Sequence, residues 1–170
     1  PGLEAGMAEQ LAEIDRITAN PEPATFENTI AALERAGRTL DRVRTVYGIY
    51  SSTLNDEAVQ SVEREMAPRL AAFQDQVTQN EKLFERISAV YAARETSDLT
   101  AEQQRLTWLY YTNFVRAGAK LDADAKKQLS EINQTLATLF TKFGQNVLAD
   151  ENDGQRVIEN EAALAGLPAS

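Results

Sequence analysis

Apolar residues recur three or four positions apart along most of the chain, the spacing that places them on one face of an α-helix. This pattern predicts an all-α fold, a bundle of about six mostly long antiparallel helices that bury their apolar faces against one another. We expect residues 1–149 to form this helical lobe. Residues 150–170 are expected to form a connecting segment, with a turn at 150–154, a strand-like stretch at 156–158 and one or two helical turns at 161–166.

The stretch 20–54 carries the longest seven-residue repeat and predicts a central helix about 40 Å long. Pro21 and Pro23 end the helix that precedes it, and Thr25 occupies the position of an N-cap. We interpret Gly37 and Gly48, which lie inside the repeat, as sites of close packing against a neighbouring helix rather than as hinges. The repeat consists of Phe26, Leu33, Leu40, Tyr47 and Leu54.

The clearest helical spacing lies in residues 122–149, where Asp122 is the expected N-cap. Its apolar positions define one face, which we expect to be buried in the bundle. These positions are Ala125, Leu129, Ile132, Leu136, Leu139, Phe143 and Val147.

Local signals mark the ends of the remaining helices. Asp56 and Asn80 are expected N-caps, and Thr100 with Gln103 matches the capping box. Gly118 is placed as a C-terminal cap. A proline at position 68 interrupts an apolar face without changing its phase, so we expect a kinked helix there or two helices in line.

Composition removes several classes of function. The formal net charge of −9 argues against nucleic-acid and membrane partners, because no basic stripe opposes the acidic field. No apolar run approaches the roughly eighteen residues of a membrane span. The chain has no cysteine and no histidine, which excludes disulfides, imidazole ligands and the nucleophile systems that depend on histidine.

Two patterns are candidate sites. Residues 150–154 resemble a calcium loop, but the first and last ligand positions are Ala149 and Asn160, so an exposed acidic turn is the better interpretation. An aromatic cluster lies at residues 108–114, where core packing accounts for Tyr110 and Phe114. Trp108 and Tyr111 are candidates for an interface with a missing domain or, less favourably, for a ligand contact. No catalytic, cofactor-binding or metal-binding residue is therefore predicted.

Several short strings, taken together and in order, resemble one enzyme family. They resemble the N-terminal region of the thimet-oligopeptidase-like zinc metallopeptidases, above all bacterial peptidyl-dipeptidases and oligopeptidase A. The resemblance runs from end to end, although many relatives carry a histidine where this chain has Phe73. The strings lie at residues 4–7, 23–30, 32–34, 67–72, 83–87, 114–119, 131–133, 145–148 and 164–168.

The resemblance implies a largely helical enzyme whose two lobes flank a channel for short oligopeptides. It also implies a zinc ion held by a HExxH helix and a further glutamate in the C-terminal part of the full chain. No position here matches that motif, so this segment would be one wall of the channel and inactive alone. Its expected partner is the catalytic lobe of the same chain, and we expect the isolated segment to expose a surface through which it self-associates.

Two alternatives remain open. A free-standing helical module that binds a partner helix is the first, and a metal bundle built only from carboxylates is the second, weaker one. The chain starts at Pro1 without a methionine and ends without a terminal element, so we expect a piece of a longer protein. No signal peptide is visible, and the expected location is the cytoplasm.

Overall fold

The computed structural model describes residues 1–155 and Ala165, and within them every regular element is a helix. The all-α prediction is confirmed. Six helices have 13 residues or more, which matches the expected number. The elements are α1 (Gly2–Thr18), the π-helical turn η1 (Phe26–Ile30), α2 (Ala31–Arg35), α3 (Arg38–Thr53), α4 (Glu57–Thr78), α5 (Glu81–Ala93), α6 (Ala101–Arg116) and α7 (Ala123–Gly154).

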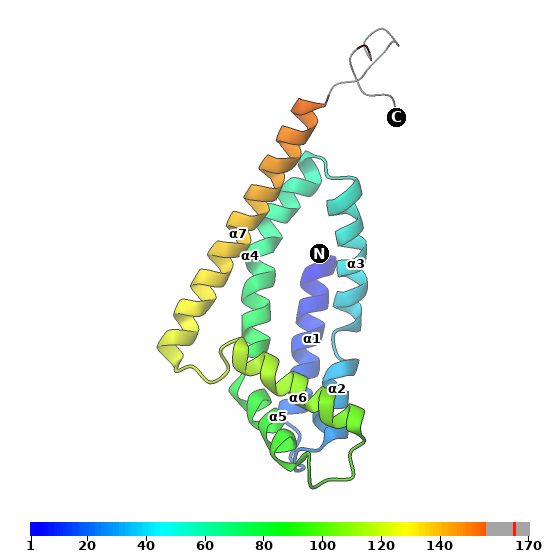
Figure 1. Ribbon diagram of the computed structural model, residues 1–170, viewed down its shortest axis with the longest axis vertical. Coiled ribbons are helices and arrows are strands. Elements are labelled where there is room, and N and C mark those ends of the chain that lie inside the picture. Colours follow the sequence, from blue (N-terminus) through cyan, green and yellow to red (C-terminus); the bar gives the residue numbers. More distant parts are fainter. Residues whose placement is uncertain (156–164, 166–170) are drawn as a thin grey trace.

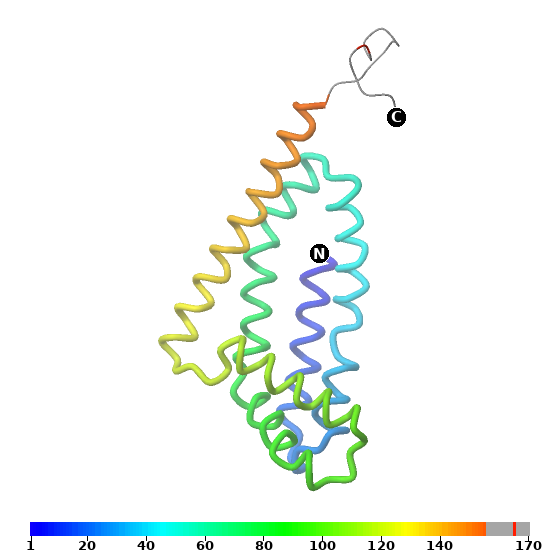
Figure 2. The backbone as a smooth tube through the Cα atoms, viewed as in Figure 1, coloured from blue at the N-terminus to red at the C-terminus, as the bar shows by residue number. Residues whose placement is uncertain are grey.

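Helices α1, α3, α4 and α7 follow the long axis of the molecule (Figure 1). Helix α1 lies between α3 and α4, and α7 runs along the outer side of α4. Helices α5 and α6 lie across one end, beside η1 and α2. The backbone trace shows that α1 and α4 run in one direction while α3 and α7 run in the other (Figure 2). The neighbours α1 and α3, and likewise α4 and α7, are therefore antiparallel.

The hydrophobic core lies where α1, α3 and α4 meet the crossed end of the molecule. At its closest point, a Cβ added to Gly6 of α1 would lie 2.8 Å from the Cα of Leu40 in α3. The core is formed by Leu3, Ile14, Ile17, Ile30, Leu40, Met66, Phe73, Val77, Leu83, Ile87, Val90, Phe114 and Ala119. Phe73 thus has the packing role that was expected where many relatives carry histidine.

The predicted central helix is broken, and this expectation was wrong. Ala36 is extended, and Gly37 has φ of 80°, a left-handed backbone that favours glycine. The backbone N–H of Gly37 donates a 2.7 Å hydrogen bond to Glu13 Oε2 of α1, which holds the break in place. Gly48 lies inside α3, but a Cβ added there would meet nothing within 4 Å, so its close-packing role is also wrong.

Most predicted caps are present. The capping boxes Thr25–Asn28 and Thr100–Gln103 both form, and the side chains at positions 56, 80 and 122 cap α4, α5 and α7. Gly118 ends α6 with φ of 92°, and the N–H after it bonds to the Phe114 carbonyl, as in a Schellman motif.

Pro68 lies inside a single helix, α4, so of the two expected forms the structure has the one with an uninterrupted helix. One boundary differs from expectation. Helix α7 continues through Gly154, so the turn predicted at residues 150–154 is helical. The strand predicted at 156–158 lies outside the described residues, as does most of the segment 161–166.

The loop between α1 and η1 is held by one arginine of α5. Arg86 donates from Nη1 to the carbonyls of Asn20, at 3.0 Å, and Glu22, at 3.1 Å. Its Nη2 donates to Asn28 Oδ1 at 2.8 Å. A loop with two prolines forms few backbone hydrogen bonds of its own, so the guanidinium supplies donors for its carbonyls.

Candidate functional site: the exposed face of α7

Helix α7 meets α4 through polar side chains. Gln145 Nε2 donates to the Gln60 carbonyl and to Glu63 Oε2, both at 3.0 Å. Arg64 of α4 donates to Gln145 Oε1 at 2.9 Å. The amide of Gln145 is therefore satisfied on both sides, and it fixes the rotation of the last third of α7 about its axis.

The same polar contact continues along the helix. Asn133 Nδ2 donates to Asp75 Oδ1 of α4 at 2.8 Å. Nearer the start of α7, Lys126 is almost fully buried, and its ammonium lies 3.0 Å from Glu81 Oε1 at the beginning of α5. Lys126 and Asn133, seven positions apart, share one face of α7, and Gln145 lies about 120° from Asn133 around the helix, so these residues mark the broad side of α7 that is turned toward α4 and α5.

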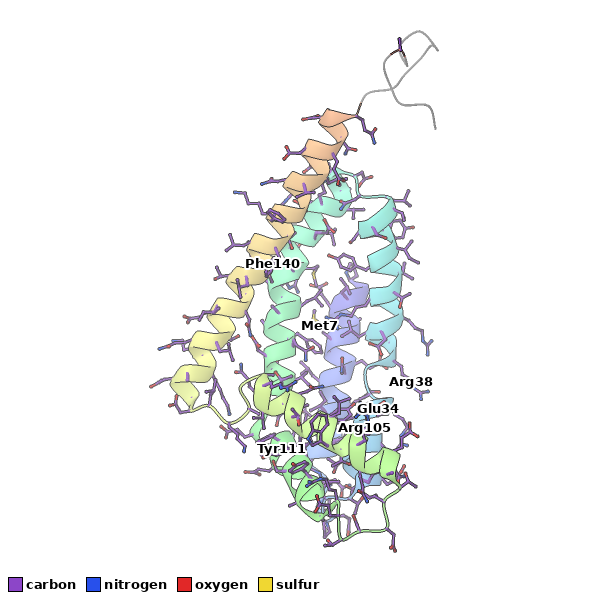
Figure 3. The ribbon with its side chains drawn as sticks, in the orientation of Figure 1. Met7, Glu34, Arg38, Arg105, Tyr111 and Phe140 are labelled. Atoms are coloured by element: carbon purple, nitrogen blue, oxygen red, sulfur yellow. The ribbon has the colours of Figure 1, made fainter. Side chains whose placement is uncertain are left out.

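The apolar face of α7 points away from α4. Phe140 and Phe143 are 69% and 67% exposed, and Figure 3 labels Phe140 about halfway along the helix. The prediction that this face is buried in the bundle was wrong for the residues described. The other large apolar residues of α7 that are exposed are Ile132, Leu136, Leu139 and Val147.

This arrangement has a physical reason. The spacing of apolar residues shows which of them share a face, but not which neighbour that face meets. In α4 the apolar residues Met66, Phe73 and Val77 face the core, so the side left for α7 offers polar groups. Burial of a large apolar side chain contributes about 1.5–3 kcal/mol. An exposed row of this length is typical of a surface that packs against another polypeptide.

A second apolar group is exposed on α3 and α4. Val46, Ile49 and Tyr50 lie on the second half of α3, and Leu54 directly follows its end. Val62 lies on α4. Leu54 is the last residue of the seven-residue repeat, a face that we had expected to be buried in the bundle. Within the repeat, Leu40 is buried in the core, Phe26, Leu33 and Tyr47 pack against the core, and Leu54 is exposed.

The aromatic residues of α6 largely pack inside the protein. Tyr111 stacks on Tyr91 of α5, with ring centroids 3.9 Å apart, and on Phe84 at 5.7 Å. Phe114 is buried in the core, as expected. Trp108 remains 42% exposed. Core packing therefore accounts for Tyr111, and Trp108 alone keeps the surface position that we had suggested for an interface or a ligand.

The described residues contain no group of three or more acidic side chains arranged to hold a metal ion. Nor does any helix in residues 1–155 combine the length and hydrophobicity that crossing a membrane requires. The most distinctive surface of residues 1–155 is the apolar face of α7.

Comparison with known proteins gives a consistent result. A dipeptidyl carboxypeptidase of Escherichia coli strain K12 is 35% identical over 167 residues, which cover 98% of this chain and 24% of that protein. The dipeptidyl carboxypeptidase of Salmonella typhimurium is 32% identical, covering 98% of this chain and 25% of its own length. The oligopeptidase A of Haemophilus influenzae is 26% identical over the whole chain and 25% of its own length. This chain is homologous to a part of these peptidases.

The homology confirms the resemblance to thimet-oligopeptidase-like metallopeptidases that the ordered strings indicated. No family model matches the chain. The chain spans about a quarter of the length of the peptidases it matches. An apolar face that meets nothing within the described residues is compatible with homology to one part of a much longer peptidase.

Sequence reasoning missed two features of α7. Phe140 was left out of the apolar face, although it follows Leu136 by four positions and precedes Phe143 by three. The polar contacts with α4 and α5 were not recognised either, although Lys126 and Asn133 lie seven positions apart and so share a face of the helix.

Proposed function

We propose that this chain is the N-terminal part of a zinc-dependent oligopeptidase of the peptidyl-dipeptidase or oligopeptidase A type. The observation that carries the proposal is identity of 35% over 98% of the chain to a dipeptidyl carboxypeptidase. The hydrolysis of short peptides would be performed by residues outside this chain. With no histidine, the chain cannot itself supply the ligands of a HExxH zinc site.

Within that enzyme, we propose that the segment forms a wall of the substrate channel and is inactive alone. Its partner would be the catalytic lobe of the same polypeptide, which would cover the apolar face of α7. Two observations support this partner. The matched peptidases are about four times as long as this chain, and the face carries two phenylalanines that are more than half exposed.

Activity assays test the first part of the proposal. We expect the parent protein to cleave short oligopeptides and to lose activity with a zinc chelator, and we expect the 170-residue segment to show no cleavage. The reading frame that follows Ser170 should encode HExxH. Chelator-sensitive cleavage by the segment alone, or a natural stop codon near Ser170, would contradict the proposal.

Substitutions on α7 test the proposed contact between lobes. Phe140→Ser with Phe143→Ser should lower the thermal stability and peptidase activity of the parent protein, because two buried aromatic contacts are lost. The same pair should leave the stability of the isolated segment nearly unchanged. Lys142→Ser is the matched control, since Lys142 is exposed on the same helix. Equal effects of the pair on the parent and the segment would refute the contact.

The exposed face of α7 also suits the second candidate, a free-standing module that binds an amphipathic helix. The reading frame distinguishes the two, because a module would end near Ser170. We also propose a cytoplasmic location for the parent protein, which fractionation of cells that produce it would test.

A further inference from the structure

The outward face of α6 carries an exposed tryptophan between two arginines. Trp108 and Leu109 are each 42% exposed, and Arg105 and Arg116 are also exposed. Figure 3 labels Arg105 near the crossed end of the molecule. At 100° per residue, these side chains lie within about 100° of one another around the helix. We call them, together with the half-buried Thr112 between them, the α6 stripe.

The opposite face of α6 fixes the rotation of the helix about its axis. Thr107 and Phe114 are buried there, and Tyr111 stacks on Tyr91 with ring centroids 3.9 Å apart. A capping box holds the first turn, and the left-handed Gly118 ends the helix. The α6 stripe is therefore presented by a helix that is already ordered, so a partner would pay little entropy to order it.

The two arginines of the α6 stripe are not neutralised by the protein. Within residues 1–155, neither Arg105 nor Arg116 forms an ion pair, and neither lies over an aromatic ring. Residues 101–120 contain three basic side chains and one acidic side chain, in a chain whose formal net charge is −9. The α6 stripe is thus a local positive region on an acidic protein.

The composition of the α6 stripe is typical of a binding surface. Tryptophan and arginine are the residues most enriched among those that contribute most to protein–protein binding. A guanidinium pairs with a carboxylate through two parallel hydrogen bonds, which gives such a contact direction as well as energy. Eleven residues separate Arg105 from Arg116, about 16 Å along the axis. Two carboxylates eleven positions apart on a second helix have the same separation.

We propose that the α6 stripe binds an acidic amphipathic helix of a separate partner protein. Two carboxylates of that helix pair with Arg105 and Arg116. Apolar side chains four and seven positions after the first carboxylate lie on the same face of the partner helix and cover Trp108 and Leu109. The partner is identified by charge complementarity and by the helical spacing of the stripe. The proposal does not depend on the proposed peptidase function.

Charge separates this partner from other occupants. The exposed apolar row of α7 in a second copy does not match, because residues 132–149 contain one lysine and no acidic residue. Nucleic acids and anionic membranes are extended polyanions, which the acidic surface around the stripe repels. A single helix needs to contact the stripe alone, and charges more than about 8 Å away are largely screened at physiological ionic strength.

Fluorescence of Trp108 tests the proposal directly, because it is the only tryptophan of the chain. The probe is an alanine-rich helical peptide with two glutamates eleven positions apart and leucines four and seven positions after the first glutamate. We expect the emission to move to shorter wavelength and to saturate at submillimolar peptide, because Trp108 is removed from water. A peptide with lysine in place of both glutamates should cause no shift at the same concentration.

Two variants and one control separate the charged and apolar contributions. Arg105→Gln with Arg116→Gln should weaken peptide binding about fivefold, the effect of two exposed ion pairs. Leu109→Ser should weaken it about tenfold through lost apolar burial, and it keeps Trp108 as the probe. Arg44→Gln on α3 removes an equal charge from an exposed arginine outside the stripe and should change nothing.

Three results would overturn the proposal. The first is an equal shift with the lysine peptide, and the second is unchanged affinity in both variants. The third is a shift of the Trp108 emission that grows with protein concentration in the absence of peptide, which would assign the α6 stripe to contact between copies of this chain.

Discussion

The phenol of Tyr110 donates a 2.6 Å hydrogen bond to Glu34 Oε1, which joins α6 to α2 across 76 residues of sequence. The pKa of Tyr110 is raised, first because the phenol is largely buried and then because Glu34 accepts a hydrogen bond from the hydroxyl and carries a negative charge. Figure 3 shows Glu34 and Arg105 of α6 at the same end of the molecule. This contact connects the segment before the Gly37 break to the crossed helices.

Removal of the Tyr110 hydroxyl should lower the stability of the protein. For Tyr110→Phe we expect a decrease of about 1 kcal/mol in the free energy of unfolding, the usual net contribution of one hydrogen bond. The ring still packs, so the loss isolates the hydrogen bond. Denaturant unfolding measures it. Thr112→Ser on the same helix is a control of similar size, and equal losses from both changes would show that the bond contributes little.

Alkaline pH should lower the folding stability of the wild type more than that of Tyr110→Phe. The folded protein holds the Tyr110 proton above the ordinary pKa of tyrosine, about 10, so the stabilisation is complete below that pH. As the pH rises above about 10, the unfolded chain ionises while the folded one does not, and stability falls. The difference in the free energy of unfolding between the wild type and Tyr110→Phe should therefore be largest at neutral pH and should shrink above pH 10, as denaturant unfolding at both pH values would measure.

Two glycines should respond in opposite directions to alanine. At Gly6 the new Cβ would lie 2.8 Å from the backbone of Leu40, so α1 and α3 must separate, and we expect a loss of about 1–3 kcal/mol. Gly48 lies inside α3 with no atom within 4 Å, so alanine should stabilise by up to about 1 kcal/mol. Thermal unfolding distinguishes the two. A stabilising Gly6→Ala would mean that the helices cross less closely than described.

The Arg86 contacts predict that the proline loop depends on α5. Arg86→Ala removes two hydrogen bonds from the guanidinium to loop carbonyls and one to Asn28 of η1, and we expect the free energy of unfolding to fall by roughly 1.5–3 kcal/mol. Amide hydrogen exchange should also increase at residues 19–25. Arg105→Ala, an exposed arginine on α6, is the matched control. Unchanged exchange in the loop would show that its own backbone holds it in place.

The features that sequence predicted are those decided by nearby residues. Thr25, Thr100 and Asp122 cap helices because each side chain reaches an N–H three positions away. Helical spacing likewise revealed the all-α class and most helix ends. The break at Gly37 depends instead on Glu13, 24 residues earlier, which accepts its N–H. No local pattern in residues 20–54 contains that contact, so the repeat was extended across it.

The prediction that the apolar face of α7 is buried in the bundle was wrong for a related reason. Spacing identified Ile132, Leu136 and Phe143 as one face of a helix but could not say what covers that face. The answer depends on α4, whose own apolar residues are used by the core. Under the proposed function, the polypeptide that covers this face lies outside this chain. Sequence patterns are therefore informative about faces and much less informative about which faces meet.

The exposed apolar residues of α7 predict how the isolated chain behaves in solution. Among the large apolar residues that the structure describes, Phe140 and Phe143 are the most exposed. Contact between two copies through these side chains would therefore remove apolar surface from water. The net charge of −9 opposes such contact, and added salt screens this repulsion. We therefore expect concentration-dependent self-association that increases with salt. Analytical ultracentrifugation measures it.

The Phe140→Ser, Phe143→Ser pair should make the isolated chain more monomeric without unfolding it. A core substitution gives the contrasting result: Ile87→Ala should cost about 2–5 kcal/mol, because Ile87 is fully buried, and it should not reduce association by the folded protein. Burial thus separates the two roles, since exposed aromatic residues act on association and buried aliphatic residues on folding. A wild-type chain that stays strictly monomeric at high concentration and high salt would show that charge repulsion outweighs the apolar face.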